Sequence, residues 1–201
     1  ALFANSNDSK GLYRLRDTNG DDQFDEVKLL KSTEGGVGHG RNDLALGPDG
    51  LIYAIHGDSV KPPNDVTWRT AREDESVTPQ GYVARLNPDG TNWEILTRGL
   101  RNPYGIAFNP DGEMFTYDAD NEGDIGLPLY RPARVNHLVP GGNYGWRQAN
   151  QTWSWPAYSP DSWPTTLDLG RGSPTAVKFG TRSNFPEVYR NALFVLVWAY
   201  G

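Results

Sequence analysis

Two acidic stretches carry residue types that bind a hard cation. In the first, Asp17, Asn19, Asp21 and Asp25 have the spacing of calcium-loop positions 1, 3, 5 and 9, although Lys28 stands where such a loop has a bidentate Glu. The second is the run 118–124, which reads Asp-Ala-Asp-Asn-Glu-Gly-Asp. Any bound metal is therefore expected to be oxygen-ligated and calcium-like. The alternative is a metal-free, Asx-rich turn in the first stretch and solvated acids in the second.

One histidine has the setting of a general base. His39 lies in the run Gly-Gly-Val-Gly-His-Gly at 35–40, five residues ahead of a predicted strand that starts at Leu44. An imidazole can take a proton from a substrate hydroxyl near neutral pH. The alternative is a histidine that is merely held by loop hydrogen bonds. His56, at the end of the next predicted strand, is the second candidate for the base.

A third candidate is the pair Arg101-Asn102, which begins another predicted strand. A guanidinium can bind an oxygen that gains negative charge, and the adjacent amide can donate a second hydrogen bond. The alternative is that Arg101 bonds loop carbonyls and Asn102 sets the turn before Pro103.

Composition excludes several other chemistries. The 201 residues contain no cysteine, which excludes disulfides, thiolate nucleophiles, Cys-ligated zinc and covalent c-type haem within the chain. Nineteen Lys and Arg against 25 Asp and Glu give a net charge of −6, which argues against a nucleic-acid partner. No apolar run approaches the length of about 18 residues that a membrane helix needs. Because the chain starts at Ala1 without a leader, we expect a mature or internal start.

An internal repeat predicts the elements that position these residues. The segment 44–53 matches the segment 106–115 at a constant offset of 62 residues, and each copy has Pro-Asp-Gly at its centre. A third Pro-Asp-Gly joins the predicted strands 81–87 and 92–97. Proline fixes φ and glycine supplies the left-handed position, so each unit specifies two antiparallel strands. We therefore predict an all-β propeller of four-stranded blades, with inner strands near 43–47, 51–56, 103–109 and 113–117.

The length of the chain predicts about four blades, whereas propellers close with four to eight. We expect blade boundaries at 1–38, 39–100, 101–170 and 171–201, with irregular insertions at 61–80 and 150–175. A second chain or a further segment is expected to complete the ring. Trp153, Trp155, Tyr158 and Trp163 could form an aromatic platform for a sugar, or pack over a blade edge.

Three runs in order connect the chain to a known family. They are 81–90, which ends in Asn-Pro-Asp-Gly, 100–108, which contains Arg-Asn-Pro-Tyr-Gly, and 140–146, which contains Gly-Gly-Asn-Tyr-Gly-Trp. With these runs the chain resembles the soluble quinoprotein sugar dehydrogenases, six-bladed propellers that use pyrroloquinoline quinone (PQQ) and calcium. The segment 11–30 is similar to the sorbosone dehydrogenase branch of that superfamily, which includes membrane-bound dehydrogenases.

The resemblance implies a role for each candidate. It places the base on His39, the quinone contacts on Arg101 and Asn102, and main-chain carbonyl ligands of a quinone-bound calcium on Asp120 and Asn121. The first acidic stretch is then the second candidate for calcium. These residues should converge at one end of the propeller axis, close enough for one substrate and one cofactor to bridge them.

The sequence departs from the family at three places, and at one of them Ala199 stands near the position where glucose-oxidising members have a Lys that helps to hold the quinone. Gly38 stands where the family has an Asp before its histidine, and Ala133-Arg134 stand where the family has an acidic pair that serves a structural calcium.

Three functions remain open at this point. The first is oxidation of a sugar or a related alcohol or aldehyde by hydride transfer to PQQ, with electrons passing to an external acceptor. The second is a calcium-dependent hydrolase of lactonase type, and the third is a propeller that binds a carbohydrate or a protein without chemistry. The resemblance favours the first and implies a periplasmic or extracellular location.

Overall fold

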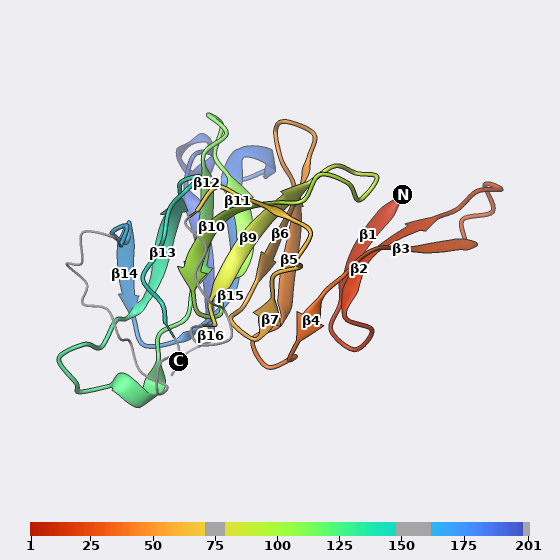
Figure 1. The fold of residues 1–201 in the computed structure, drawn as a ribbon. Coiled ribbons are helices and arrows are strands. Elements are labelled where there is room, and N and C mark those ends of the chain that lie inside the picture. Colours follow the sequence, from red (N-terminus) through yellow and green to blue (C-terminus); the bar gives the residue numbers. More distant parts are fainter. Residues whose placement is uncertain (71–78, 148–161, 199–201) are drawn as a thin grey trace.

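The computed structural model describes residues 1–70, 79–147 and 162–198, and these form four successive sheets (Figure 1). The first sheet contains β1 (Leu2–Ser6), β2 (Gly11–Arg16) and β3 (Glu26–Ser32) in that order. The second has the order β5 (Arg41–Leu46), β6 (Ile52–His56), β9 (Gly81–Leu86), β10 (Glu94–Leu100) and β8 (Thr67–Trp68). The third contains β11 (Tyr104–Phe108), β12 (Met114–Asp118), β13 (Ala133–Leu138) and β14 (Leu167–Gly170). The fourth pairs β15 (Ser173–Phe179) with β16 (Leu193–Trp198), and a two-residue pair, β4 (Glu34–Gly35) with β7 (Val60–Lys61), joins two loops.

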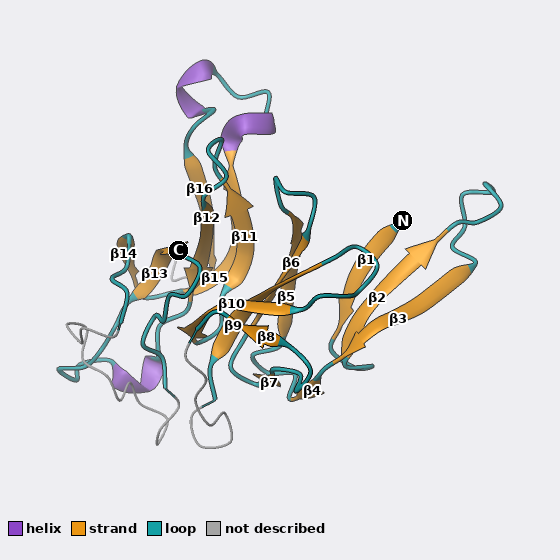
Figure 2. Cartoon of the chain, turned by 45° about the horizontal axis from the view of Figure 1, so that its top comes forward, coloured by secondary structure: helices purple, strands orange, loops and turns teal. Residues whose placement is uncertain are grey.

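Helical structure within the described ranges is limited to single 3-10 turns. These are η1 (Glu122–Asp124), η3 (Gly180–Arg182) and η4 (Glu187–Tyr189), which Figure 2 shows at the ends of sheets. No helix in this part of the chain is long and apolar enough to cross a membrane. The predicted all-β class is therefore confirmed.

The Pro-Asp-Gly repeat forms antiparallel hairpins as its turn chemistry predicts. Gly50 and Gly112 have φ of 76° and 85°, and each donates its N–H to the carbonyl three residues earlier. The registers repeat as well: Leu44 lies opposite Ala54 in the pair β5–β6, and Ile106 lies opposite Thr116 in the pair β11–β12. The offset of 62 residues thus relates two structurally equivalent hairpins.

The sheets follow one another around a common axis. The first strand of each sheet contacts the first strand of the next, in the order β1, β5, β11 and β15 (Figure 2). The remaining strands then lead outward, so the chain is an arc of a β-propeller.

The strand counts differ in detail from four strands per blade. The described residues give sheets of three, five, four and two strands. The extra strand β8 pairs in parallel with β10, and β14 is the outermost strand of the third sheet. Both lie in stretches predicted to be irregular, because strands of two and four residues are too short to show a period of two.

The core lies between neighbouring sheets. Along β6, Ile52 and Ala54 pack toward the first sheet, whereas Tyr53 and Ile55 pack toward the third. A strand covered on both faces in this way must be apolar at successive positions, as β6 is. The packing of both faces holds the ends of the inner strands, where the candidate residues lie, in fixed positions.

Candidate active site

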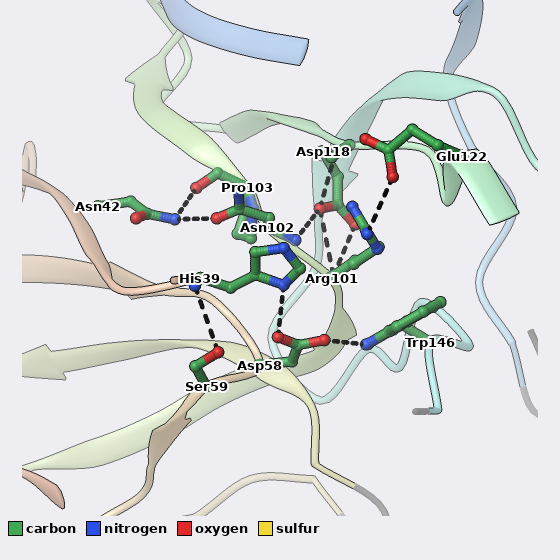
Figure 3. A network of polar contacts seen from close by, with 11 residues as sticks. His39, Asn42, Asp58, Ser59, Arg101, Asn102, Pro103, Asp118, Glu122 and Trp146 are labelled. Atoms are coloured by element: carbon green, nitrogen blue, oxygen red, sulfur yellow. Dashed lines mark hydrogen bonds and ion pairs between the residues drawn. The ribbon is translucent and has the colours of Figure 1, made fainter. Parts of the chain in front are cut away.

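His39 is held by an aspartate that sequence analysis did not single out. It lies in the loop before β5, and its Nδ1 is 2.7 Å from Oδ1 of Asp58, which follows β6 (Figure 3). The Asp58 side chain is 1% exposed and that of His39 is 26% exposed. With Nδ1–H donated to the carboxylate, Nε2 of His39 is the nitrogen that can accept a proton. A carboxylate from the end of the neighbouring strand thus orients the ring of His39.

The second oxygen of Asp58 joins this pair to another blade. Nε1 of Trp146 donates to Asp58 Oδ2 at 2.7 Å, and the backbone N–H of Asp58 donates to the carbonyl of Arg101 at 2.8 Å. The Arg101 guanidinium lies over the ring of Trp146, 5.5 Å from its centroid. Asp58 therefore links His39 to two of the three sequence motifs that carry the family resemblance (Figure 3).

The motif 141–146 reaches this position by pairing with the end of β10. The N–H of Tyr144 donates to Arg98 O, and the N–H of Trp146 donates to Gly99 O, each at 2.9 Å. Gly99 has φ of +80°, and a Cβ atom there would lie 2.6 Å from the Tyr144 nitrogen. Only glycine permits this close approach, which places Trp146 against Asp58.

A buried carboxylate fixes the turn that carries Arg101 and Asn102. Asp118, at the end of β12, is fully buried and accepts the N–H groups of Arg101 at 3.0 Å and of Asn102 at 2.9 Å. Its Oδ2 is 3.6 Å from Nη2 of Arg134. Burial raises the pKa of Asp118, while Arg134 and the two backbone N–H groups oppose the rise. Asp118 thus positions the backbone of the Arg-Asn pair.

His39, Arg101 and Asn102 line one cavity of about 420 Å³. The same cavity is lined by Tyr104, Ala119 and Glu122 and, from the fourth blade, by Ser173, Pro174, Thr175 and Trp198. Glu122 Oε2 accepts from Arg101 Nη2 at 3.1 Å. The structure therefore brings the sequence-predicted base and the Arg-Asn pair to one opening between the second, third and fourth blades.

The predicted calcium turn adjoins this opening. Asp120 lines a neighbouring cavity of about 260 Å³ that shares Glu122, Ser173 and Trp198 with the first. Its Oδ2 accepts the Tyr130 hydroxyl at 2.7 Å, and the Asn121 carbonyl accepts the N–H of Asp124 at 3.0 Å. Burial raises the pKa of Asp120, and Tyr130 opposes the rise. Burial and the Asp120 carboxylate in turn raise the pKa of Tyr130.

The acidic hairpin turn lies elsewhere, in the loop between β2 and β3 on the far side of the molecule from β13 and β14 (Figure 1). Asp17 accepts the N–H groups of Asn19, Gly20 and Asp22, and Asp25 accepts both the N–H and the hydroxyl of Thr18. The bond from Gly20 lowers the pKa of Asp17, and the Thr18 hydroxyl lowers that of Asp25. In the part of the chain that the structure describes, no three His, Asp or Glu side chains are grouped as metal ligands, here or at Asp120.

His56 does not have the setting of a base. It is 1% exposed, and neither ring nitrogen has a hydrogen-bond partner among the described residues. Burial lowers its pKa to about 3, with a further contribution from the positive charge of Arg41. The aromatic residues Trp153, Trp155 and Tyr158 lie outside the described residues, and Trp163 lines a different cavity, beside Arg131 and Arg134.

The repeat contains a signal for Asp58, to which sequence analysis assigned no role. The offset of 62 that relates the two hairpins also pairs Asp58 with Asp120. Both are buried, and each accepts a hydrogen bond from an aromatic side chain, Trp146 and Tyr130 respectively. Extending the repeat by five residues would have marked Asp58 as a structural equivalent of Asp120.

Comparison with known proteins agrees with this geometry. The chain is 30% identical over 142 residues to quinoprotein glucose dehydrogenase B of Acinetobacter calcoaceticus, which corresponds to 60% of this chain and 28% of that protein. In structure it is similar to the PQQ-bound aldose sugar dehydrogenase of Streptomyces coelicolor, with a TM-score of 0.61 and 20% identity over 84% of this chain and 49% of that one. A glucose dehydrogenase gives a TM-score of 0.68 at 20% identity, over 96% and 59%.

These likenesses confirm the resemblance to the quinoprotein sugar dehydrogenases and the propeller fold, while the chain spans less than two thirds of each of these relatives. A family model described as the domain of unknown function DUF7133 matches residues 7–158. Since that match covers well over half of the sequence, the chain belongs to the DUF7133 family.

Proposed function

We propose that this chain forms part of a PQQ-dependent dehydrogenase that oxidises a sugar or a related alcohol or aldehyde. The observation that carries the proposal is the placement of a His-Asp pair and an Arg-Asn pair on one cavity. Hydride removal from a hydroxyl-bearing carbon requires a base for the hydroxyl proton and an acceptor for the hydride, and an Arg-Asn pair can stabilise the negative charge that such an acceptor gains. The similarity to quinoprotein glucose dehydrogenase B supports the quinone as the oxidant.

The donors at the cavity fit an orthoquinone that carries carboxylates. Nε of Arg101 is buried and has no hydrogen-bond partner among the described residues, although the side chain lines the cavity. A buried donor without an acceptor is costly unless a ligand satisfies it. Arg101 and the Asn102 amide would hold the quinone oxygens, and the bound quinone would supply the hydride acceptor.

His39 provides the proton acceptor in this proposal. Asp58 holds Nδ1–H, so Nε2 takes the substrate hydroxyl proton, and the carboxylate then stabilises the imidazolium that forms. Trp146 and the packed end of β6 keep Asp58 from turning away. The ring of His39 is the partly exposed member of the pair, as a group that meets substrate must be.

For the metal, we propose calcium held by the main-chain carbonyls of Asp120 and Asn121 together with the quinone. The carboxylate of Asp120 is engaged by Tyr130, whereas a carbonyl that already accepts one N–H retains a second lone pair. The turn with Asp17, Asn19, Asp21 and Asp25 stays the second candidate. At the family's structural calcium position the buried Arg134 carries a positive charge, which opposes a cation there.

The proposal also covers the blade boundaries, the completion of the ring, the electron acceptor and the location of the protein. We propose that 1–38, 39–100, 101–170 and 171–201 belong to successive blades, and that a second chain or a further segment completes the ring. Electrons leave to an external acceptor, and the protein works in the periplasm or outside the cell. The acceptor and the location rest on the family resemblance alone.

The test is quinone reduction in the complete protein. PQQ and calcium are added, then a series of sugars, while quinone absorbance and reduction of a dye acceptor are followed. We expect both signals in the wild type, and a weaker quinone response in Arg101→Ala with little change in sugar binding. The matched control is Arg190→Ala, which removes an exposed arginine paired with Glu187. Lactone hydrolysis without any quinone signal would instead establish a hydrolase, and sugar binding without either signal a binding module.

A further inference from the structure

We propose that Asn42 is a positioning residue that sets which end of the Asn102 amide faces the cofactor, an inference that rests on the proposed function. Asn42 lies in β5, one blade before Asn102. Its Nδ2 donates to Oδ1 of Asn102 at 2.8 Å and to the carbonyl of Pro103 at 2.8 Å (Figure 3). No other sequence feature marks Asn42, which adjoins none of the three family motifs.

The bond from Asn42 to the Pro103 carbonyl determines which amide atoms of Asn42 and Asn102 face each other. A main-chain carbonyl can only accept, so the Asn42 atom beside Pro103 O must be the NH2 group. That NH2 group also faces Asn102, which must therefore present its oxygen. The two bonds together remove the two-fold ambiguity of both amides. The donor that Asn102 retains for the cavity it lines is its own NH2 group.

The surroundings hold both partners in place. The N–H of Asn102 is bound by the buried Asp118, which fixes the backbone from which the amide extends. Next to Asn42, Asp43 accepts the N–H of Ile106 at 3.1 Å, which fastens β5 to β11. Because both backbones are fixed, the orientation of the Asn102 amide depends on the hydrogen-bonding character of residue 42.

The orientation matters most after the quinone is reduced. An NH2 group stabilises the negative charge that a quinone oxygen gains, whereas an amide oxygen in its place would repel that charge. Turning the amide over should thus weaken binding of the reduced quinone more than that of the oxidised quinone. A residue that only supports the fold would weaken both equally.

The decisive variant is Asn42→Asp in the complete protein with calcium. The carboxylate has the same shape but can only accept, so Asn102 must turn its NH2 group toward residue 42. We expect a roughly tenfold to hundredfold loss of affinity for reduced PQQ and a smaller loss for oxidised PQQ, both measured by fluorescence titration. The matched control is Asn87→Asp, which adds the same charge in an exposed turn of the same blade. Thermal melts of each variant separate loss of the fold from loss of orientation.

A double-mutant cycle with Asn102→Ala separates orientation from the added charge. If Asn42 acts through Asn102, Asn42→Asp costs nothing further once Asn102 is alanine. An undiminished loss in that background would overturn the proposal, as would unchanged affinities in Asn42→Asp alongside a loss in Asn102→Ala. Either result leaves the proposed function standing. Wild-type protein that binds no PQQ in either form would overturn both.

Discussion

The hairpin turn at 17–25 and the active-site opening beside Asp58 both depend on carboxylates, but these carboxylates have different partners. In the turn, the bonds that Asp17 and Asp25 accept come from residues no more than seven positions away. At the opening, Asp58 binds side chains 19 and 88 positions away. A carboxylate whose hydrogen-bond donors all lie in its own loop stabilises the shape of that loop. A carboxylate that binds side chains from distant parts of the chain can orient functional groups such as the His39 ring.

The two regions also differ in the free energy that each carboxylate controls. The acids of the turn are exposed, apart from the half-buried Asp17, so water replaces a lost hydrogen bond at little cost. Asp58 is buried, and its removal would leave Nε1 of Trp146 and Nδ1 of His39 without a hydrogen-bond acceptor. Each unpaired group would lower the free energy of unfolding by about 1 to 3 kcal/mol. Substitutions at the opening should therefore change activity and stability far more than those in the turn.

The largest effect is expected at His39. His39→Ala removes the proton acceptor and should lower turnover about 10²- to 10⁴-fold while affinity for the quinone changes little. Steady-state dye reduction with the complete protein measures it. His137→Ala, which removes a histidine paired with Glu113 away from the cavity, is the control. A decrease in turnover of less than threefold in His39→Ala would show that His39 is not the general base.

The next largest effect is expected at Asp58. Asn has one acceptor oxygen, so in Asp58→Asn it cannot accept from both Trp146 and His39, and His39 would move its proton to Nε2. Turnover should fall about 10- to 100-fold, which is part of the contribution of about 10²- to 10⁴-fold that a positioned general base makes. Turnover and thermal melting of this variant are compared with those of Asp111→Asn in an exposed turn. Equal activities of the two variants would show that Asp58 is only structural.

A smaller effect is expected from the buried His56, in the pH dependence of stability. The folded pKa of His56 is about 3, below the ordinary value of 6.5, so the neutral ring stabilises the fold above pH 6.5 and this contribution is lost as the pH falls from 6.5 toward 3. From pH 7.5 to 5.5 the loss should be about 1.4 kcal/mol. Denaturant unfolding of wild type and His56→Leu at both pH values measures it. The same slope in both proteins would assign the acid sensitivity to other groups.

The smallest effect is expected in the hairpin. Asp17→Asn keeps an acceptor for the turn N–H groups, so the free energy of unfolding should change little and turnover should not change. Unfolding with and without calcium provides the measurement. If calcium stabilises the wild type and Asp17→Asn abolishes this effect, the turn is a metal site. The turn would then have a role beyond its own shape, contrary to the comparison made above.

The sequence predicted the inner hairpins because their information is local. Pro-Asp-Gly and the alternation around it specify each turn and its two strands, and the constant offset relates the copies. The short strands β8 and β14 carry no such period, and their pairing depends on neighbours placed by the rest of the sheet. Local chemistry therefore predicted the blade, but not all of its outer strands.

The sequence predicted those residues of the candidate site whose type and immediate neighbours indicate a chemical role. His39 and the Arg101-Asn102 pair have side chains and neighbours that suggest a base and an oxyanion partner. The roles of Asp58, Trp146 and Asn42 depend on contacts between blades, which no spacing within one strand encodes. The extended repeat would mark Asp58, but the contacts that these residues make can be identified only when the inner strands are placed around the axis.

The most direct test of the central claim is a single turnover of the bound quinone. The complete protein, loaded with PQQ and calcium, is mixed with an aldose, and the quinone absorbance is followed in wild type and in His39→Ala. The account predicts equal quinone binding in both proteins, with rapid reduction in the wild type and reduction slowed about 10²- to 10⁴-fold in the variant. Failure of the wild type to bind the quinone, or equal rates of reduction in the two proteins, would contradict it.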